Sequence, residues 1–173
     1  MNRKRLGALL LTFMLTLGLV AVPQAGSAAN ENLALGATAI TKSDFNSGYG
    51  KEKLNDGITS GANNMRWTTD WSVAANNIGQ WCGVEFDVPT KIDKIVFYEY
   101  DSRITEYKVE YMDAEGNWNV VQKDGAALAN QTKEAKETVN SAHSVANTVT
   151  FDAVEAKAVR LYIVNVGEKA GAS

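Results

Sequence analysis

Residues 105–118 read TEYKVEYMDAEGNW, and this stretch decides the class of fold. From Tyr107 onward an aromatic or apolar residue alternates with a charged one, Lys108 and then Glu110. A period of two predicts a half-buried β-strand. The DAEGNW segment that follows has the turn residues of a hairpin and leads into a second strand at Trp118. The stretch therefore predicts an antiparallel pair of strands with Tyr107, Val109 and Tyr111 facing the core.

Other segments of the chain have strand-like patterns of their own. These segments are QWCGVEFDV (80–88), KIDKIVFYEY (91–100), NTVTF (147–151) and KAVRLYIVNV (157–166). Residues 124–147 carry almost no large apolar side chain and are predicted to be a long surface excursion between two strands. At least six strands and no convincing amphipathic helix predict one all-β domain, an antiparallel β-sandwich or jelly roll.

The N-terminal segment is predicted to be a secretory signal peptide. MNRKR carries three positive charges, residues 6–22 carry none, and the small residues of PQAGSAAN follow. This order is typical of a signal peptide cut after Ala28 or Ala29. The alternative is a transmembrane anchor, but the apolar run is shorter than the roughly 20 residues that a span requires. We therefore expect export, removal of residues 1–29, and a secreted or cell-surface domain formed by residues 30–173.

Charge and cysteine content argue against several classes of protein. The 173-residue chain has a formal net charge of −3, and loss of the three basic residues of MNRKR leaves 14 basic against 20 acidic residues, or −6. That balance argues against nucleic acid and anionic lipid as partners. No later segment is apolar enough to span a membrane. The single cysteine, Cys82, alternates with apolar residues, which predicts a buried, inert thiol and no internal disulfide.

No catalytic constellation is visible in the sequence. The only histidine, His143, lies in a polar stretch and is interpreted as a solvated loop residue rather than a general base. Glu99 and Asp101 lie at the end of a strand close to Arg103. An ion pair between Glu99 and Arg103, or a ligand-binding role, is favoured over a catalytic pair of carboxylates. The chain itself is therefore not expected to be an enzyme.

Six motifs follow one another along the chain after the signal peptide. They are NLALGATA (32–39), GYGKEKLNDG (48–57), MRW (65–67), QWCGVEFDVPTKIDKIVFY (80–98), YKVEYMDAEGNWNVV (107–121) and AKAVRLYIVN (156–165). In this order they resemble the motifs of the discoidin domains, also called coagulation factor V/VIII type C domains. The resemblance covers residues 32–173 and implies the galactose-binding-like fold, a β-sandwich jelly roll.

The resemblance also implies a function. In secreted bacterial proteins the members of this family are mostly family 32-type carbohydrate-binding modules joined to glycoside hydrolases or other surface proteins. They hold a glycan in loops at one end of the sandwich and do no chemistry. We therefore expect a secreted module that binds a polysaccharide or a galactose-type oligosaccharide. Two alternatives stay open: an adhesion domain that binds protein or lipid through apolar loop residues such as Phe45 and Ile78, or the N-terminal fragment of a secreted glycosidase.

Many members of the family carry a structural calcium ion, and the resemblance places it at the Asp-Gly turn. The implied ligands are the carbonyl groups of Leu54 and Ala172, the side chain of Asp56, and Thr59 or Asn63. Either Thr59 or Asn63 is expected to replace a family threonine, because Met65 stands in its place. The alternative is a plain Asp-Gly turn without metal. The chain stops at GEKAGAS, where the family's closing strand begins, so the C-terminal strand is expected to be truncated.

The glycan site is expected on the loops at one end of the sandwich. Trp67 matches the family tryptophan that packs under the loops, whereas Trp71 has no such place in the pattern. Trp71 is expected either to stack on the apolar face of a sugar or to fold back onto the sandwich. The polar side chains expected to hydrogen-bond sugar hydroxyls are Asn46, Asn76, Glu99, Asp101 and Arg103.

Overall fold

The structure is a computed structural model that divides the chain into two units, residues 1–31 and 32–173. It describes residues 31–59, 65–69, 77–100, 103–134 and 144–167. Three short 3-10 helices are Leu33–Gly36 (η1), Ser47–Tyr49 (η2) and Lys51–Lys53 (η3). The strands are Thr38–Thr41 (β1), Trp81–Tyr100 (β2), Ile104–Met112 (β3), Trp118–Val120 (β4), Gln122–Lys123 (β5), Ala126–Ala127 (β6), Gln131–Thr132 (β7) and Ser144–Val166 (β8). No helix within these ranges is long and apolar enough to cross a membrane.

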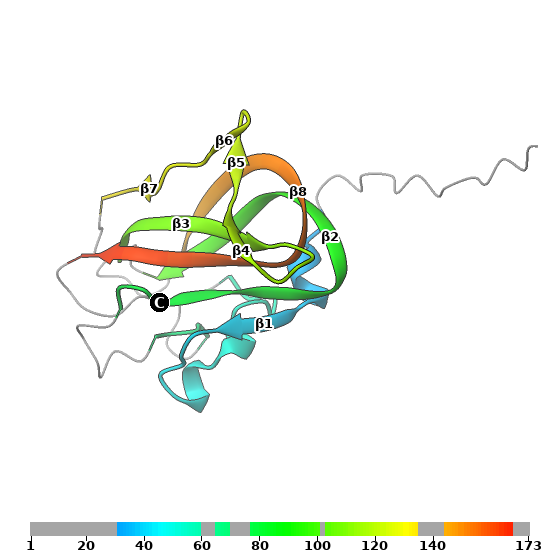
Figure 1. Ribbon diagram of the computed structural model, residues 1–173. Coiled ribbons are helices and arrows are strands. Elements are labelled where there is room, and N and C mark those ends of the chain that lie inside the picture. Colours follow the sequence, from blue (N-terminus) through cyan, green and yellow to red (C-terminus); the bar gives the residue numbers. More distant parts are fainter. Residues whose placement is uncertain (1–30, 60–64, 70–76, 101–102, 135–143, 168–173) are drawn as a thin grey trace, which may run out of the picture. The chain divides into compact units, whose positions relative to one another are not determined.

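The main sheet has the strand order β1-β2-β8-β3-β4, and all of its pairs are antiparallel (Figure 1). The short strand β7 adds to β3, and β5 pairs with β6 in a separate hairpin. The turn at residues 113–117 joins β3 to β4, as the DAEGNW pattern predicts. Backbone hydrogen bonds across neighbouring strands therefore hold together segments that are far apart in the sequence.

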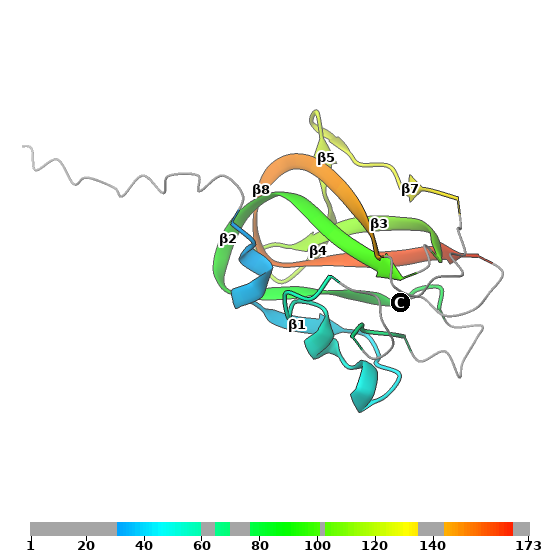
Figure 2. The ribbon, with the colours of Figure 1, turned by 180° about the vertical axis from the view of Figure 1, so that it is seen from behind.

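Strands β2 and β8 are long enough to enter both layers of the sandwich. Residues 81–85 pair with the C-terminal half of β8, and residues 90–100 pair with its N-terminal half. The register shifts between Glu85 and Thr90, and Pro89, which has no N–H to donate, lies within this shift. Figures 1 and 2 show the two strands arching away from the sheet together, so that the same pair of strands covers the core from both sides.

The hydrophobic core lies between the two layers. Its buried residues include Val84, Val109, Leu161 and Ile163 from the sheet and Ile92, Val149 and Phe151 from the arching segments. The predicted inward face of β3 is confirmed, because Tyr107 and Val109 are buried and Tyr111 packs against the core. The predicted all-β antiparallel sandwich is therefore the observed fold.

The expected division into separate strands is wrong in detail, and the predicted surface excursion carries short strands of its own. The four separate segments at 80–88, 91–100, 147–151 and 157–166 form only two strands, because the bend around Pro89 shifts the register without ending either strand. Residues 124–134 of the excursion are mostly exposed, and they contain two short strands. β6 pairs with β5 and β7 pairs with β3, so backbone hydrogen bonds hold this segment to the domain.

Gly83 marks the closest approach between β2 and β8. A Cβ atom at this position would lie 2.0 Å from the carbonyl oxygen of Val159 and 2.8 Å from the Cα of Arg160. Both neighbours are backbone atoms, which cannot turn aside as a flexible side chain can. Only glycine therefore fits at this point of the pairing.

We expect Gly83→Ala to lower the free energy of unfolding by about 3 kcal/mol, since overpacking against backbone belongs at the upper end of the usual cost. Urea denaturation followed by tryptophan fluorescence measures this. Gly36→Ala is the matched control, because a Cβ at Gly36 meets nothing within 4 Å. Equal stabilities of the two variants would contradict the close approach.

Candidate functional site

Loop segments from several parts of the chain meet beside the end of β2. Backbone hydrogen bonds join Phe45 N to Thr68 O (2.9 Å) and Thr68 N to Tyr49 O (3.2 Å), so the segment before η3 lies against residues 65–69. The hydroxyl of Ser43 donates to the side-chain oxygen of Gln80 (2.9 Å). These contacts give the loops a fixed base.

Trp67 anchors this base. Its side chain is 4 % exposed, and its indole N–H donates to the Ser43 carbonyl (3.2 Å) and to Asp44 Oδ1 (2.8 Å). Asp44 also accepts a hydrogen bond from the Thr41 hydroxyl at the end of β1 (2.8 Å). A buried tryptophan with a satisfied N–H is a structural element. The predicted role of Trp67 under the loops is therefore confirmed.

The neighbouring residue, Arg66, belongs to a group of stacked side chains. Its guanidinium carbon lies 4.0 Å from the ring centroid of Tyr100 and 5.3 Å from that of Tyr49. The guanidinium of Arg103 lies 5.4 Å from the Tyr100 ring, and the rings of Phe45 and Tyr49 are 5.9 Å apart. We call these five residues, Phe45, Tyr49, Arg66, Tyr100 and Arg103, the arginine–aromatic cluster.

The cluster brings together three segments and contains one of the predicted polar contacts, Arg103. Asn46 is adjacent and exposed, but its side-chain oxygen caps η2 by accepting from Gly48 N (2.9 Å). Arg66 and Tyr100 were not among the predicted site residues. The Arg-Trp pair of the MRW motif was the available signal for Arg66, whereas nothing local singles out Tyr100.

Glu99 does not lie at the surface of this cluster. Its side chain is 1 % exposed and accepts from Ile104 N (2.5 Å) and from the ammonium of Lys133. Burial raises the pKa of the Glu99 carboxyl, and the Ile104 amide and Lys133 partly offset that rise. Glu99 thus ties together the two ends of the loop that carries Tyr100 and Arg103, and it offers no accessible surface to a ligand.

The remaining predicted glycan contacts, Trp71, Asn76 and Asp101, lie outside the described residues and stay predictions. The same holds for the calcium ligand Ala172 and for His143. Among the described residues, no group of three or more His, Cys, Asp or Glu side chains is arranged to hold a metal ion.

The Asp-Gly turn itself is well ordered by hydrogen bonding. Asp56 Oδ1 accepts from Ile58 N (2.8 Å), which is the geometry of an Asx turn, and Gly57 has a positive φ of 82°. Asp56 and Thr59 are exposed and Leu54 is half-buried. Calcium takes six to eight oxygen ligands, and these three residues carry oxygens of the right chemical kind for some of them. The predicted calcium stays a prediction.

Cys82 packs partly buried against the core. Its pKa is raised to about 12, first because burial disfavours the thiolate and second because the charge of Glu99 repels it. A thiol with this pKa stays protonated at neutral pH and is a poor nucleophile. This agrees with the predicted inert cysteine.

The family of the chain follows from its sequence. Residues 37–173 match the F5/8 type C domains. The chain belongs to the F5/8 type C domain family. The predicted resemblance is thereby confirmed, and the loops described above are those of an F5/8 type C domain. A sequence search of the curated proteins found no match.

Solved structures of the same fold include carbohydrate-binding modules. Chitosan-binding module 1 from a chitosanase/glucanase of Paenibacillus sp. IK-5 is 19 % identical, with a TM-score of 0.57 over 83 % of this chain and 93 % of that one. CpGH89CBM32-5 of Clostridium perfringens, in complex with GalNAc-β-1,3-galactose, is 16 % identical, with a TM-score of 0.57 over 81 % and 94 %. A putative α-L-fucosidase of Bacteroides thetaiotaomicron is 19 % identical, with a TM-score of 0.55 over 82 % of this chain but 27 % of the fucosidase. These likenesses show that the chain has the β-sandwich fold of carbohydrate-binding modules.

The buried carboxyl of Glu99 gives a pH-dependent prediction. Because its folded-state pKa is raised above the ordinary value of 4.5, its contribution to stability is fully present below that value and is lost as the pH rises through the folded-state pKa. Glu99→Gln keeps an oxygen for the Ile104 amide and cannot ionise. Relative to the wild type, its free energy of unfolding should therefore increase as the pH rises above the ordinary value of 4.5.

Urea unfolding at several pH values checks this difference. Glu155→Gln, which removes the same charge from an exposed position on β8, is the control. If the difference in the free energy of unfolding between Glu99→Gln and the wild type did not change with pH, or changed in the opposite direction, the buried environment of Glu99 would be contradicted.

Proposed function

We propose that this F5/8 type C domain is a secreted, non-catalytic module that binds a glycan at the arginine–aromatic cluster. The observation that carries the proposal is the contact of the Arg66 guanidinium with the rings of Tyr100 and Tyr49, together with the Arg103 guanidinium 5.4 Å from the Tyr100 ring. A planar guanidinium presents five N–H donors in a fixed fork. Stacking on a ring fixes the plane of that fork, so the side chain loses little freedom when a ligand binds.

Sugars suit such a site for two chemical reasons. Their hydroxyl groups accept hydrogen bonds from guanidinium groups, and the C–H face of the ring packs against aromatic side chains. Phe45, Tyr49 and Tyr100 supply aromatic surface, and Arg66 and Arg103 supply donors. Trp71, from the loop that follows Thr69, is proposed to add a stacking surface, with Asn46, Asn76 and Asp101 as further polar contacts.

The proposed ligand is a polysaccharide or a galactose-type oligosaccharide. Two of the similar structures are named as a chitosan-binding module and as a complex with GalNAc-β-1,3-galactose. The part of the fucosidase that matches this chain is about a quarter of its length.

By analogy with the fucosidase, we propose that this module targets an attached glycoside hydrolase or surface protein. We also propose that calcium bound near Asp56 stabilises the loops.

A second function, binding of protein or lipid, is favoured by one observation. Ile58, Met65 and Ile78 are 49 %, 43 % and 56 % exposed on the loop segments. Apolar side chains at loop tips are typical of contact with another protein or a membrane. The experiment below separates the two functions.

A glycan-array screen of the purified protein, in calcium and in EDTA, tests the proposal. We expect binding to a defined glycan that falls by about 10- to 100-fold in Arg66→Lys, Arg103→Ala and Trp71→Ala, since each loses a charge-assisted hydrogen bond or a stacking surface. Arg66→Lys keeps the charge but loses the fork of donors. Lys91→Ala, at an exposed position of β2, is the matched control.

Unchanged melting temperatures of the variants establish that folding is intact. Weaker binding in EDTA supports the calcium proposal, and equal binding argues against it. A folded protein that binds no glycan on the array refutes the glycan proposal and favours the exposed apolar residues. In that case, Ile58→Ser and Ile78→Ser should reduce binding to a protein or lipid partner.

A further inference from the structure

A second group of aromatic and charged side chains lies on the outer face of the main sheet. Trp81 pairs with Tyr162, Lys108 with Tyr162, Glu110 with Arg160, and Trp118 with Met112. Residues opposite one another share a face of a sheet. The alternate residues Val84, Val109 and Leu161 face the core, so this set faces away from it. We call Trp81, Lys108, Glu110, Trp118, Arg160 and Tyr162 the outer-face network.

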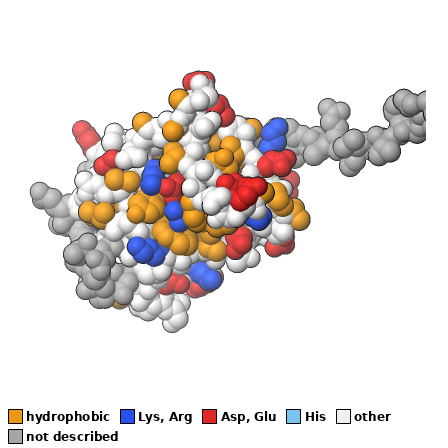
Figure 3. All heavy atoms as spheres, viewed as in Figure 1, with side chains coloured by type: hydrophobic (Ala, Val, Ile, Leu, Met, Phe, Trp, Pro, Cys, Tyr) orange, Lys and Arg blue, Asp and Glu red, His pale blue; other side chains and the backbone are white. Residues whose placement is uncertain are grey.

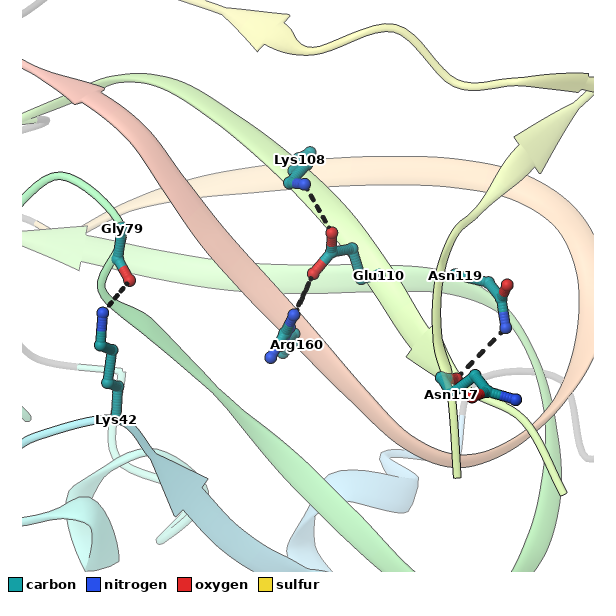
Figure 4. A network of polar contacts seen from close by, with 7 residues as sticks. All are labelled: Lys42, Gly79, Lys108, Glu110, Asn117, Asn119 and Arg160. Carbon is teal, nitrogen blue, oxygen red and sulfur yellow. Dashed lines mark hydrogen bonds and ion pairs between the residues drawn. The ribbon is translucent and has the colours of Figure 1, made fainter. Parts of the chain in front are cut away.

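The charged members of this network are held in one arrangement (Figure 4). Arg160 donates to Glu110 Oε2 through two nitrogens, Nε at 2.7 Å and Nη2 at 2.6 Å, and Lys108 Nζ donates to Glu110 Oε1 at 2.7 Å. Glu110 itself is buried, with 5 % exposure. Its single negative charge therefore faces two cations, and the network has an excess of positive charge.

The aromatic members surround the guanidinium group. Its carbon lies 4.0 Å from the ring centroid of Trp118, 5.1 Å from that of Trp81 and 5.5 Å from that of Tyr162. The two tryptophan rings are 6.2 Å apart, and Lys108 Nζ lies 4.6 Å from the Tyr162 ring. All three aromatic side chains are partly exposed. A solvent-facing side of an antiparallel sheet is ordinarily polar, so three partly exposed aromatics here are unusual.

A third cation lies next to Tyr162. Lys42 is exposed, and its Nζ donates to the Gly79 carbonyl at 3.0 Å. A Cβ built on Gly79 would lie 3.3 Å from the Tyr162 hydroxyl and 3.9 Å from Lys42 Nζ, so both groups flank this glycine. Figure 3 shows basic, acidic and hydrophobic side chains interspersed over the side of the molecule seen in Figure 1.

Besides Glu110, the strands of this face carry the acidic residues Glu106 and Glu85, and the turn before Trp118 carries Asp113 and Glu115. The carboxylate of Glu106 accepts from the Asn130 amide at 2.7 Å, and Glu85 lies toward the other end of the face, opposite Ala158. Each ammonium group has three N–H donors. Lys42 and Lys108 each use one in the bonds described above, so both have donors left for a ligand beside Tyr162.

We propose that the outer face of the sheet is a second ligand site, which binds a carboxylated polysaccharide. Trp81, Trp118 and Tyr162 offer ring surface to the sugar units, and Lys42 and Lys108 bind their carboxylates. An open sheet face suits an extended chain of sugars, whereas the loop cluster suits a short segment or a chain end. This proposal does not rest on the loop site, because it uses none of its residues.

Calorimetric titration with polygalacturonate tests this proposal. We expect the wild type to bind it, and the double variant Lys42→Gln/Lys108→Gln to bind about 10-fold more weakly, since two partly exposed ion pairs are lost. Fully methyl-esterified polygalacturonate, which has the same rings without the charges, should also bind about 10-fold more weakly. Higher salt should weaken binding of the charged polymer.

The matched control is Lys91→Gln/Lys94→Gln, which removes the same charge from exposed positions on the arching half of β2. It should bind polygalacturonate as the wild type does. If both double variants lost the same affinity for polygalacturonate, the attraction would be non-specific and the proposal would be overturned. No binding of polygalacturonate by the folded wild type would also overturn it. If Arg103→Ala lost affinity for polygalacturonate and Lys42→Gln/Lys108→Gln did not, the polymer would bind at the loop site and the proposal would be overturned. None of these failures affects the outcome of the glycan array.

Discussion

The pairing of β2 with β8 is the interaction on which the rest of the structure depends. These strands stay paired on both sides of the register shift between Glu85 and Thr90, so each of them contributes to both layers. Core residues such as Val84 and Phe151 then belong to one buried cluster, although they come from different halves of the two strands. The close approach at Gly83 belongs to the same pairing. The end of β2 is thereby fixed in space, and with it the loop that follows Tyr100.

Much of this fold was predictable from the sequence, because its strongest signals are local. Alternation in YKVEY correctly predicted the inward face of β3, and DAEGNW correctly predicted the turn into β4. The length of β2 and β8 was not predictable in the same way. From the local sequence, Pro89 predicts the end of a strand, but in the structure the strand bends there and continues. A register shift depends on how two distant segments pair, so the sequence of either segment alone does not reveal it.

The candidate site was predictable only in part, because its contacts join residues far apart in the chain. Trp67 and Arg103 were found from motifs and from their position at a strand end. The stacking of Arg66 on Tyr100 spans two separate loops and has no sequence signature. Glu99 was predicted at the surface because it ends a strand of alternating residues. It is buried because Lys133, from the polar excursion, comes back to pair with it. A buried carboxylate needs such a partner, and the loop beside the site is organised as a result.

The central claim is that the arginine–aromatic cluster holds a glycan. Nuclear magnetic resonance titration with the oligosaccharide selected on the array tests it most directly, with the Arg66 side-chain N–H as the reporter. We predict that the largest shift changes occur at Arg66, Tyr100, Arg103 and residues 45–49, and that signals of Trp81 and Trp118 stay unchanged. Largest changes on the outer face, with an unchanged Arg66 signal, would contradict the account.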